Sequence, residues 1–311
     1  MGRCVSVTDY SLLLDDEVRA YIARGAEFYP PDAVNLTIIQ QRAVYDDMCA
    51  AFHAGRPEGV QTWDEPYGGV PCRRYEVGPS DVTLIYYHGG GFVVGGLHSH
   101  DDVCAELCAR TGARVISVDY GLAPETVFPA CYNDAKSAFD AISQTYTGKI
   151  LMAGDSAGGN LAAAVTHHAR DRIAGVVLIY PGLGGDPTRG SYITHANAPE
   201  LNTRDMEFYK TVRTGGAVPP VGDARFAPLH DTNFWGLPPT VIVTAQCDPL
   251  SSDGETYRDA ITAAGGQAVW FEEAGLVHGC LRARTMSKRG AAFFDRVADA
   301  ASALSRGDWP Y

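Results

Sequence analysis

The chain lacks several features that would mark particular classes of protein. Its 311 residues contain no cluster of five or more lysines and arginines, and its net charge is −12. A chain this acidic repels phosphate backbones, so we do not expect it to bind nucleic acid. No apolar run approaches the roughly 18 residues of a membrane-spanning helix. The hydrophobic fraction of 46% and the charged fraction of 20% are typical of a globular protein and exclude intrinsic disorder.

The cysteines show no spacing typical of a metal site or of a small disulfide-bonded domain. They include no Cys-X-X-Cys pair and occur singly. The eight cysteines are Cys4, Cys49, Cys72, Cys104, Cys108, Cys131, Cys247 and Cys280. A chain of this length can bury a large core without disulfides, and its first apolar run is too short for a signal peptide. We therefore expect buried thiols in a cytoplasmic protein.

Apolar residues recur with two different periods along the chain. Helical spacing over 11–55 indicates two or three helices, broken near Pro30-Pro31. Two short strands are expected at 59–65 and 70–77. From there, short apolar runs alternate with amphipathic helices, which predicts a mostly parallel sheet with helices on both faces. The expected strands are 82–87, 113–118, 150–153, 176–180, 240–244 and 267–271, and the expected helices are 100–111, 131–146, 157–170, 252–264 and 284–304.

One segment breaks this alternation. Residues 183–238 lie between two predicted strands and are too many for an ordinary connection. They contain one helical piece, 203–213, between turn-rich flanks. We interpret this segment as an inserted lid.

The sequence Gly154-Asp155-Ser156-Ala157-Gly158 fits the pattern G-x-S-x-G. It directly follows a predicted strand and directly precedes a predicted helix. A serine on such a tight corner is held in strained backbone geometry with its hydroxyl exposed, and the glycines let strand and helix approach closely. The alternative is an ordinary glycine-rich turn, but the strand-turn-helix context favours a nucleophilic Ser156.

Three consecutive glycines, Gly89 to Gly91, follow His88 at the end of another predicted strand. Their backbone N–H groups have no side chains in front of them, which suits an oxyanion hole. The alternative is a phosphate-binding loop, but neither G-x-G-x-x-G nor a P-loop lysine is present. The N–H of Ala157, at the start of a helix, would be a third donor.

A nucleophilic serine needs a histidine base that is oriented by a carboxylate. Of the nine histidines, His278 is favoured because it follows the last predicted strand, where doubly wound sheets place reacting groups. Asp248 follows the preceding strand and is the favoured carboxylate. The rival, Asp253, is expected instead to support the first turn of the next helix. The resulting order Ser156, Asp248, His278 is that of α/β-hydrolases.

These motifs resemble the hormone-sensitive-lipase-like family of α/β-hydrolases, close to bacterial acetyl and short-chain esterases. The resemblance covers about residues 80 to 300 and includes Val118-Asp119-Tyr120-Gly121-Leu122-Ala123-Pro124-Glu125, in which Gly121 replaces the usual arginine. It implies an α/β-hydrolase fold of about eight strands. It also implies a helical cap made of residues 1–50 and 183–225, over a core made of 51–182 and 226–311.

The resemblance also implies a role for each site residue. Ser156 attacks the acyl carbon, His278 transfers the proton, and Asp248 orients His278. The N–H groups of Gly90, Gly91 and Ala157 bind the oxyanion. Supporting positions around the site are assigned to His88, Gly89 and Asp155. No cofactor and no metal are implied.

The chain departs from the family pattern at two places near the triad. Cys280 stands where a phenylalanine is common after His-Gly, and Ser251-Ser252 stand where charged residues are usual. Both are expected to affect the pocket and not the reaction.

We expect a serine carboxylesterase for short acyl esters, from acetyl to butyryl or hexanoyl, acting as a monomer or homodimer on a small-molecule substrate. One alternative is a non-catalytic binding protein on the same fold, which the presence of His278 disfavours. An amidase or a lipase with the same triad is the other.

Overall fold

An eight-stranded sheet runs through the centre of the computed structural model, which describes residues 8–30 and 36–311. In spatial order the strands are β1 (Gln61–Tyr67), β2 (Val70–Glu76), β4 (Arg114–Val118), β3 (Val82–Tyr87), β5 (Lys149–Asp155), β6 (Gly175–Ile179), β7 (Thr240–Cys247) and β8 (Ala268–Val277). β2 is antiparallel to both of its neighbours, and the other pairs are parallel. The predicted α/β-hydrolase architecture, a mostly parallel sheet of about eight strands, is confirmed.

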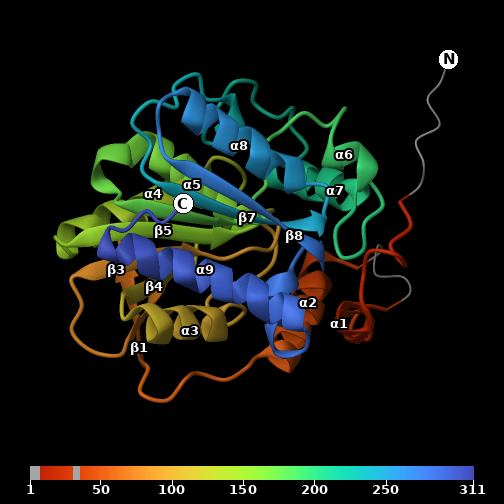
Figure 1. Ribbon diagram of the computed structural model, residues 1–311, viewed down its shortest axis with the longest axis horizontal. Helices are drawn as coiled ribbons and strands as arrows, with labels where there is room; N and C mark the ends of the chain where they lie inside the picture. The colour runs from red at the N-terminus through yellow and green to blue at the C-terminus, as the bar shows by residue number, and fades with distance from the viewer. Residues whose placement is uncertain (1–7, 31–35) are drawn as a thin grey trace.

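Helices cover both faces of the sheet, as the alternating pattern predicted. Figure 1 shows α4 (Ala130–Thr145), α5 (Ala157–Ala169) and α8 (Ser251–Ala263) on one face, and α3 (Asp101–Thr111) and α9 (Lys288–Arg306) on the other. The central strand β3 is buried along its whole length. Its alternate residues enter two different cores: Leu84 and Tyr86 pack with α3 and α9, whereas Ile85 and Tyr87 pack with α4 and α5.

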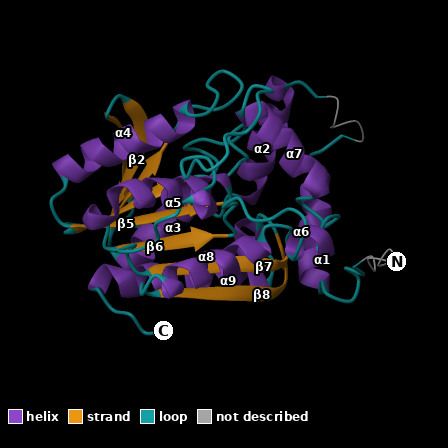
Figure 2. Ribbon diagram, turned by 90° about the horizontal axis from the view of Figure 1, so that it is seen from above, coloured by secondary structure: helices purple, strands orange, loops and turns teal. Residues whose placement is uncertain are grey.

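The remaining helices gather at the carboxyl end of the parallel strands. They are α1 (Asp16–Ala26), α2 (Ile38–Phe52), α6 (Ser191–Thr194) and α7 (Thr203–Arg213), and Figure 2 shows them together beyond the strand ends. Side-chain caps fix the starts of α1, α2 and α7: Asp15 accepts from Val18, Thr37 forms a capping box with Gln40, and Asn202 caps α7. The predicted break near Pro30 lies between α1 and α2, and Pro31 falls outside the described residues.

The largest differences from the predicted boundaries lie near the C-terminus. β8 was expected to end at Phe271 but continues to Val277, because it stays paired with β7 past a bulge between Ala245 and Cys247. A 3₁₀ turn, Cys280–Thr285, follows, and the last helix therefore begins at Lys288 and not at residue 284. The longer strand carries His278 to the end of the sheet beside Asp248.

Two further findings concern the cysteines and the helices. Seven cysteines are unbonded and buried, and Cys4 lies outside the described residues. Within residues 8–30 and 36–311, no helix combines the length and the apolar content that crossing a bilayer requires.

Candidate active site

Ser156 occupies a strained corner between β5 and α5. Its φ of 52° and ψ of −115° are unfavourable for a residue with a side chain, and α5 begins at the next residue. A Cβ on Gly154 would collide with the carbonyl of Gly158, and one on Gly158 would collide with the carbonyl of Tyr87. The glycines of the G-x-S-x-G pattern are therefore required by close backbone approach, as predicted.

The structure brings Ser156, His278 and Asp248 into one hydrogen-bonded chain. His278 Nε2 lies 2.8 Å from Ser156 Oγ, and its Nδ1 lies 2.6 Å from Asp248 Oδ2. Since a carboxylate only accepts, Nδ1 carries the proton and Nε2 is free to accept the serine proton. Asp248 is fully buried, and its other oxygen accepts from the N–H of Leu250 at 2.8 Å.

Strand register explains how Asp248 and His278 meet. Cys247 of β7 pairs with Val277 of β8, so the next residue on each strand emerges at the same edge. None of the other eight histidines, all of which lie in the described part of the chain, hydrogen-bonds to Ser156. His167 is buried and hydrogen-bonds to Asp231 and Tyr257 instead.

The glycine loop after β3 lies beside Ser156 with free backbone donors. Gly90 and Gly91 have φ values of 126° and 60°, which an L side chain rarely adopts. A Cβ on Gly91 would also collide with the ring of Tyr209. No residue in the described ranges accepts a hydrogen bond from the N–H of Gly90 or Gly91, and both residues line the cavity with Ala157. The N–H of Ala157 is at the first position of α5, where helices leave donors unpaired.

Asp155 turns away from Ser156 and holds the glycine loop from behind. Its carboxylate accepts from the N–H of Gly89 at 2.9 Å and from the hydroxyl of Tyr86 at 2.8 Å, and His100 Nε2 lies 3.2 Å away. Burial alone would raise the pKa of Asp155, but His100, Arg282 and the hydrogen bonds hold it well below its usual range. The carboxylate therefore stays charged and fixes Gly89.

His88 supports the same loop from its other side. Its ring stacks on Tyr120, with centroids 4.4 Å apart, and its Nδ1 lies 2.7 Å from the carbonyl oxygen of Gly89. Burial lowers the pKa of His88 to about 3, so the ring is neutral and donates through Nδ1.

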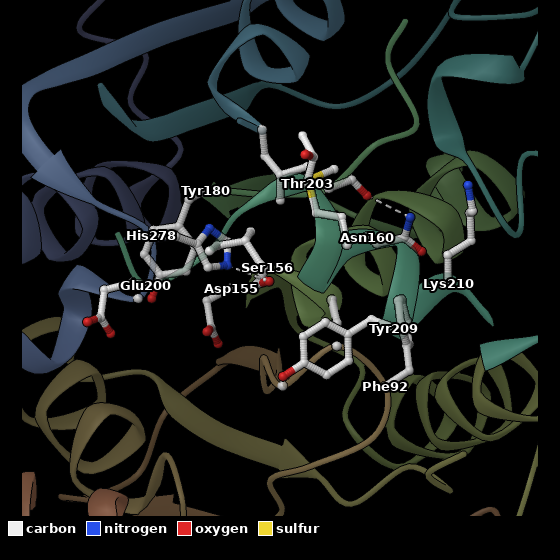
Figure 3. Close-up of a pocket in the computed structure, with 18 of the residues that line it drawn as sticks. Phe92, Asp155, Ser156, Asn160, Tyr180, Glu200, Thr203, Tyr209, Lys210 and His278 are labelled. Carbon is white, nitrogen blue, oxygen red and sulfur yellow. Dashed lines mark hydrogen bonds between the residues drawn. The ribbon is translucent and has the colours of Figure 1, made fainter. Parts of the chain in front are cut away.

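A cavity of about 620 Å³ opens above Ser156, within the size range of small-molecule sites. Figure 3 shows His278, Tyr180 and Glu200 on one side of Ser156, and Phe92, Tyr209 and Lys210 on the other. Because the histidine must reach the leaving oxygen, the His278 side is the leaving-group half and the opposite side is the acyl half.

The sequence analysis missed three residues of the cavity wall. Tyr180 follows β6 directly, a position that could have identified it, and its ring lies 4.8 Å from that of His278. Glu200 and Arg282 carry no local signal, because a loop and a 3₁₀ turn place them.

Asp253 lies in the first turn of α8, as predicted. Its carboxylate has a second role that was not expected: it accepts from the N–H groups of Leu183 and Gly184 and from the hydroxyl of Tyr192. It thus ties the inserted segment to the core. The physical reason is its full burial, which leaves backbone and phenol donors of that segment as its neighbours.

The family departures are accommodated by local packing and hydrogen bonds. Cys280 is fully buried. Ser251 Oγ donates to Glu272 at 2.7 Å, and Ser252 Oγ accepts from the N–H of Ser191 at 2.8 Å. These serines connect the start of α8 to β8 and to α6.

Comparison with known proteins agrees with this geometry. Residues 84–282 match a family model described as the alpha/beta hydrolase fold. The chain is 34% identical over 270 residues to the carboxylic ester hydrolase LipN of Mycobacterium tuberculosis, covering 80% of this chain and 72% of that one. It is 31% identical to an ethyl acetate hydrolase of Pseudomonas putida, and the match covers 68% of this chain and 72% of that one.

A solved structure of an esterase has the same fold as this chain. An esterase of the bacterial hormone-sensitive lipase family superposes with a TM-score of 0.83 at 25% identity, covering 94% of this chain and 99% of that one. The chain therefore belongs to the α/β-hydrolase fold family, within its hormone-sensitive-lipase-like esterases.

Proposed function

We propose that this chain is a serine carboxylesterase that hydrolyses short acyl esters through an acyl-enzyme intermediate. The observation that carries the proposal is the hydrogen-bonded triad of Ser156, His278 and Asp248. Ser156 and His278 line the cavity together with Gly90 and Gly91, whose N–H groups have no acceptor among the described residues. The names of the relatives, a carboxylic ester hydrolase and an ethyl acetate hydrolase, support it.

In the first half of the reaction, Ser156 Oγ attacks the acyl carbon as His278 Nε2 takes the hydroxyl proton. The charge that develops on the carbonyl oxygen is stabilised by the N–H groups of Gly90, Gly91 and Ala157. Collapse of this intermediate breaks the bond to the alcohol, which leaves with the proton from His278. The acyl group is then bound to Ser156.

In the second half, water attacks the acyl-enzyme and gives its proton to His278. The same backbone donors stabilise the second oxyanion. Ser156 then leaves with the proton from His278, which releases the carboxylic acid and restores the free enzyme. Asp248 keeps the imidazole oriented and stabilises its charged form in both halves.

The preference for short acyl chains rests on the wall of the acyl half. There the guanidinium of Arg213 lies 3.7 Å from the ring centroid of Phe92 and 4.2 Å from that of Phe226. Its side chain is buried, and burial lowers the pKa of Arg213 to about 10, which leaves it charged at neutral pH. Arg213, Phe92 and Phe226 all line the cavity, and we expect this packed wall to limit the length of the acyl chain.

Esters of p-nitrophenol with acyl chains of two to sixteen carbons test the proposal. We expect kcat/KM to be highest for acetyl to hexanoyl esters and to fall beyond eight carbons. In Ser156→Ala, turnover should drop by about 10⁴-fold or more while the fold persists. Undiminished turnover in that variant would overturn the assignment.

The alternatives predict other results in the same assays. A lipase would keep its activity beyond eight carbons, and an amidase would cleave p-nitroacetanilide at a rate comparable to the acetate ester. A binding protein would be inert toward the whole series and bind an ester without turnover.

We further propose that residues 1–50 and 183–225 form a cap over a core made of 51–182 and 226–311. The helices α1, α2, α6 and α7 contribute residues to the cavity wall, which supports this division. Residues 1–7 and 31–35 of the first cap segment lie outside the described residues. Limited proteolysis that cuts the cap segments before the core would support the boundary.

Location and assembly stay predictions. We propose a cytoplasmic monomer or homodimer, because the seven described cysteines are unbonded and buried. Cell fractionation and light scattering test the two statements separately.

A further inference from the structure

The cavity combines opposite charges with phenol rings. Figure 3 shows Glu200 on the His278 side of Ser156, and Arg282, Tyr21, Tyr29 and Tyr45 line the same cavity. None of these five side chains contacts the reacting atoms in the reaction proposed above, so they can contact the part of the substrate that leaves with the alcohol oxygen.

The Glu200 carboxylate is open to the cavity and has no hydrogen-bond or ion-pair partner within residues 8–30 and 36–311. Its Oε1 lies 4.0 Å from the position that a Cβ on Gly25 would occupy, so the bare backbone of α1 leaves it room. The backbone of Glu200 has a φ of 68°, a strained value for a residue other than glycine. Backbone strain of this kind persists only where the surrounding structure holds the backbone, and it is found most often at functional sites.

Arg282 lines the same cavity. It is 8% exposed, and its guanidinium donates to the hydroxyl of Tyr45 at 2.9 Å and to Cys49 Sγ at 3.1 Å. In the part of the chain that the structure describes, no carboxylate lies within ion-pair distance of it, and its buried Nε has no acceptor. The charge of Arg282 helps to hold the pKa of Asp155 low, and its Nε–H, which has no acceptor among the described residues, still favours a polar acceptor in the cavity.

The two charges limit which leaving groups fit. A cationic alcohol would be repelled by Arg282, and an anionic one by Glu200. Free hydroxyl groups suit both side chains because each hydroxyl can donate to one and accept from the other. Glu200 is exposed to the cavity, where its carboxylate can accept hydrogen bonds from such an alcohol. The tyrosine rings offer apolar faces to the C–H groups of such an alcohol.

We propose that Glu200 and Arg282 select esters whose alcohol part carries free hydroxyl groups, such as acetylated polyols or sugars, over esters of plain alkyl alcohols. The inference rests on the esterase function proposed above and adds the class of leaving group. Glu200 is thus a specificity-determining residue that hydrogen-bonds to the leaving alcohol.

A matched pair of substrates tests it: 2,3-dihydroxypropyl acetate and propyl acetate differ only in two hydroxyl groups. We expect the wild-type protein to favour the dihydroxy ester by about tenfold or more in kcat/KM, as a site with unpaired polar groups disfavours an analogue that lacks hydroxyls. Glu200→Leu should bring this ratio close to one, and Glu200→Gln should recover part of it. Leucine and glutamate both carry an unbranched Cβ, so the backbone strain is matched.

Glu255→Gln is the control. This carboxylate belongs to α8, is 52% exposed, lies 3.6 Å from Arg258 and does not line the cavity, so its removal should leave the ratio unchanged. A wild-type ratio near one, or an equal ratio in Glu200→Leu, overturns the inference while turnover of propyl acetate keeps the esterase proposal intact. Failure to hydrolyse either ester overturns the esterase proposal itself. A preference for acetylcholine over both esters, lost in Glu200→Leu, would also overturn the inference because Glu200 would then recognise a cation.

Discussion

The buried carboxylates of Asp155 and Asp253 each hold one of the two regions that meet above Ser156, and their surroundings shift the pKa values of the two groups in opposite directions. Asp155 holds the glycine loop at the end of β3, and His100, Arg282 and hydrogen bonds keep its pKa low in spite of burial. Asp253 holds Leu183 and Gly184 of the inserted segment, and burial raises its pKa to about 6.

This difference in pKa suggests that the glycine loop beside Ser156 is held more firmly than the inserted segment that forms part of the cavity wall. The loop with the proposed oxyanion donors is fixed by a charge that has cationic neighbours and stays ionised at any working pH. The inserted segment is fixed by hydrogen bonds to the carboxylate of Asp253, which forms no ion pair with any residue in 8–30 or 36–311. Ionisation of Asp253 therefore lowers the stability of the folded state, and this region is expected to open first.

The largest effect is expected within the rigid region, at Asp248. Asp248→Asn should lower kcat by about 10⁴-fold, because the amide favours the wrong tautomer of His278. The steady-state rate on p-nitrophenyl acetate measures this loss. The thermal midpoint of the variant should stay close to that of the wild type, which separates loss of chemistry from unfolding. A kcat within tenfold of the wild type would remove Asp248 from the triad.

An intermediate effect is expected at Asp155. Asp155→Ala leaves the N–H of Gly89 and the hydroxyl of Tyr86 unpaired, so the glycine loop should lose its position. We expect kcat to fall by about 10²- to 10³-fold, the range typical of a lost oxyanion donor, with a smaller change in KM.

Asp155→Asn provides the matched control because it keeps an acceptor for Gly89. It should recover part of the rate that the alanine variant loses. If the alanine variant kept its full kcat in a folded protein, Asp155 would not position the loop.

The smallest effect is expected at Asp253, and it concerns stability and not rate. Because its folded pKa is about 6 against a usual 3.8, the folded state binds the proton more tightly than the unfolded state. Its contribution to the free energy of unfolding is then fully present below about pH 4 and is lost as pH rises through 6.

Asp253→Asn should remove this dependence. The free energy of unfolding, measured with urea, should then change between pH 4.5 and 7 by about 1–3 kcal/mol less in the variant than in the wild type. If the pH dependence of stability were the same in the variant and the wild type, the pKa of Asp253 would not be raised, and the contrast with Asp155 would fail.

The local sequence pattern was sufficient to predict the fold class and to identify Ser156 as the candidate nucleophile. Continuous apolar runs identify the buried parallel strands, since both faces of such strands are covered, and the glycines around Ser156 mark close backbone approach. The boundaries of β8 could not be predicted. Its last six residues include two glutamates and a glycine, and they remain in the strand because β7 supplies hydrogen-bond partners.

The fold class and the candidate nucleophile Ser156 could be predicted from the sequence, because an apolar strand or a glycine-flanked serine is visible in a few neighbouring positions. The tertiary contacts could not be predicted: Asp155 holds Gly89, Asp253 holds the inserted segment, and Glu200 and Arg282 line one cavity. These pairs lie far apart in the chain, and no local period connects them. They meet because parallel strands bring distant loops to one edge of the sheet, where burial and charge determine what each side chain does.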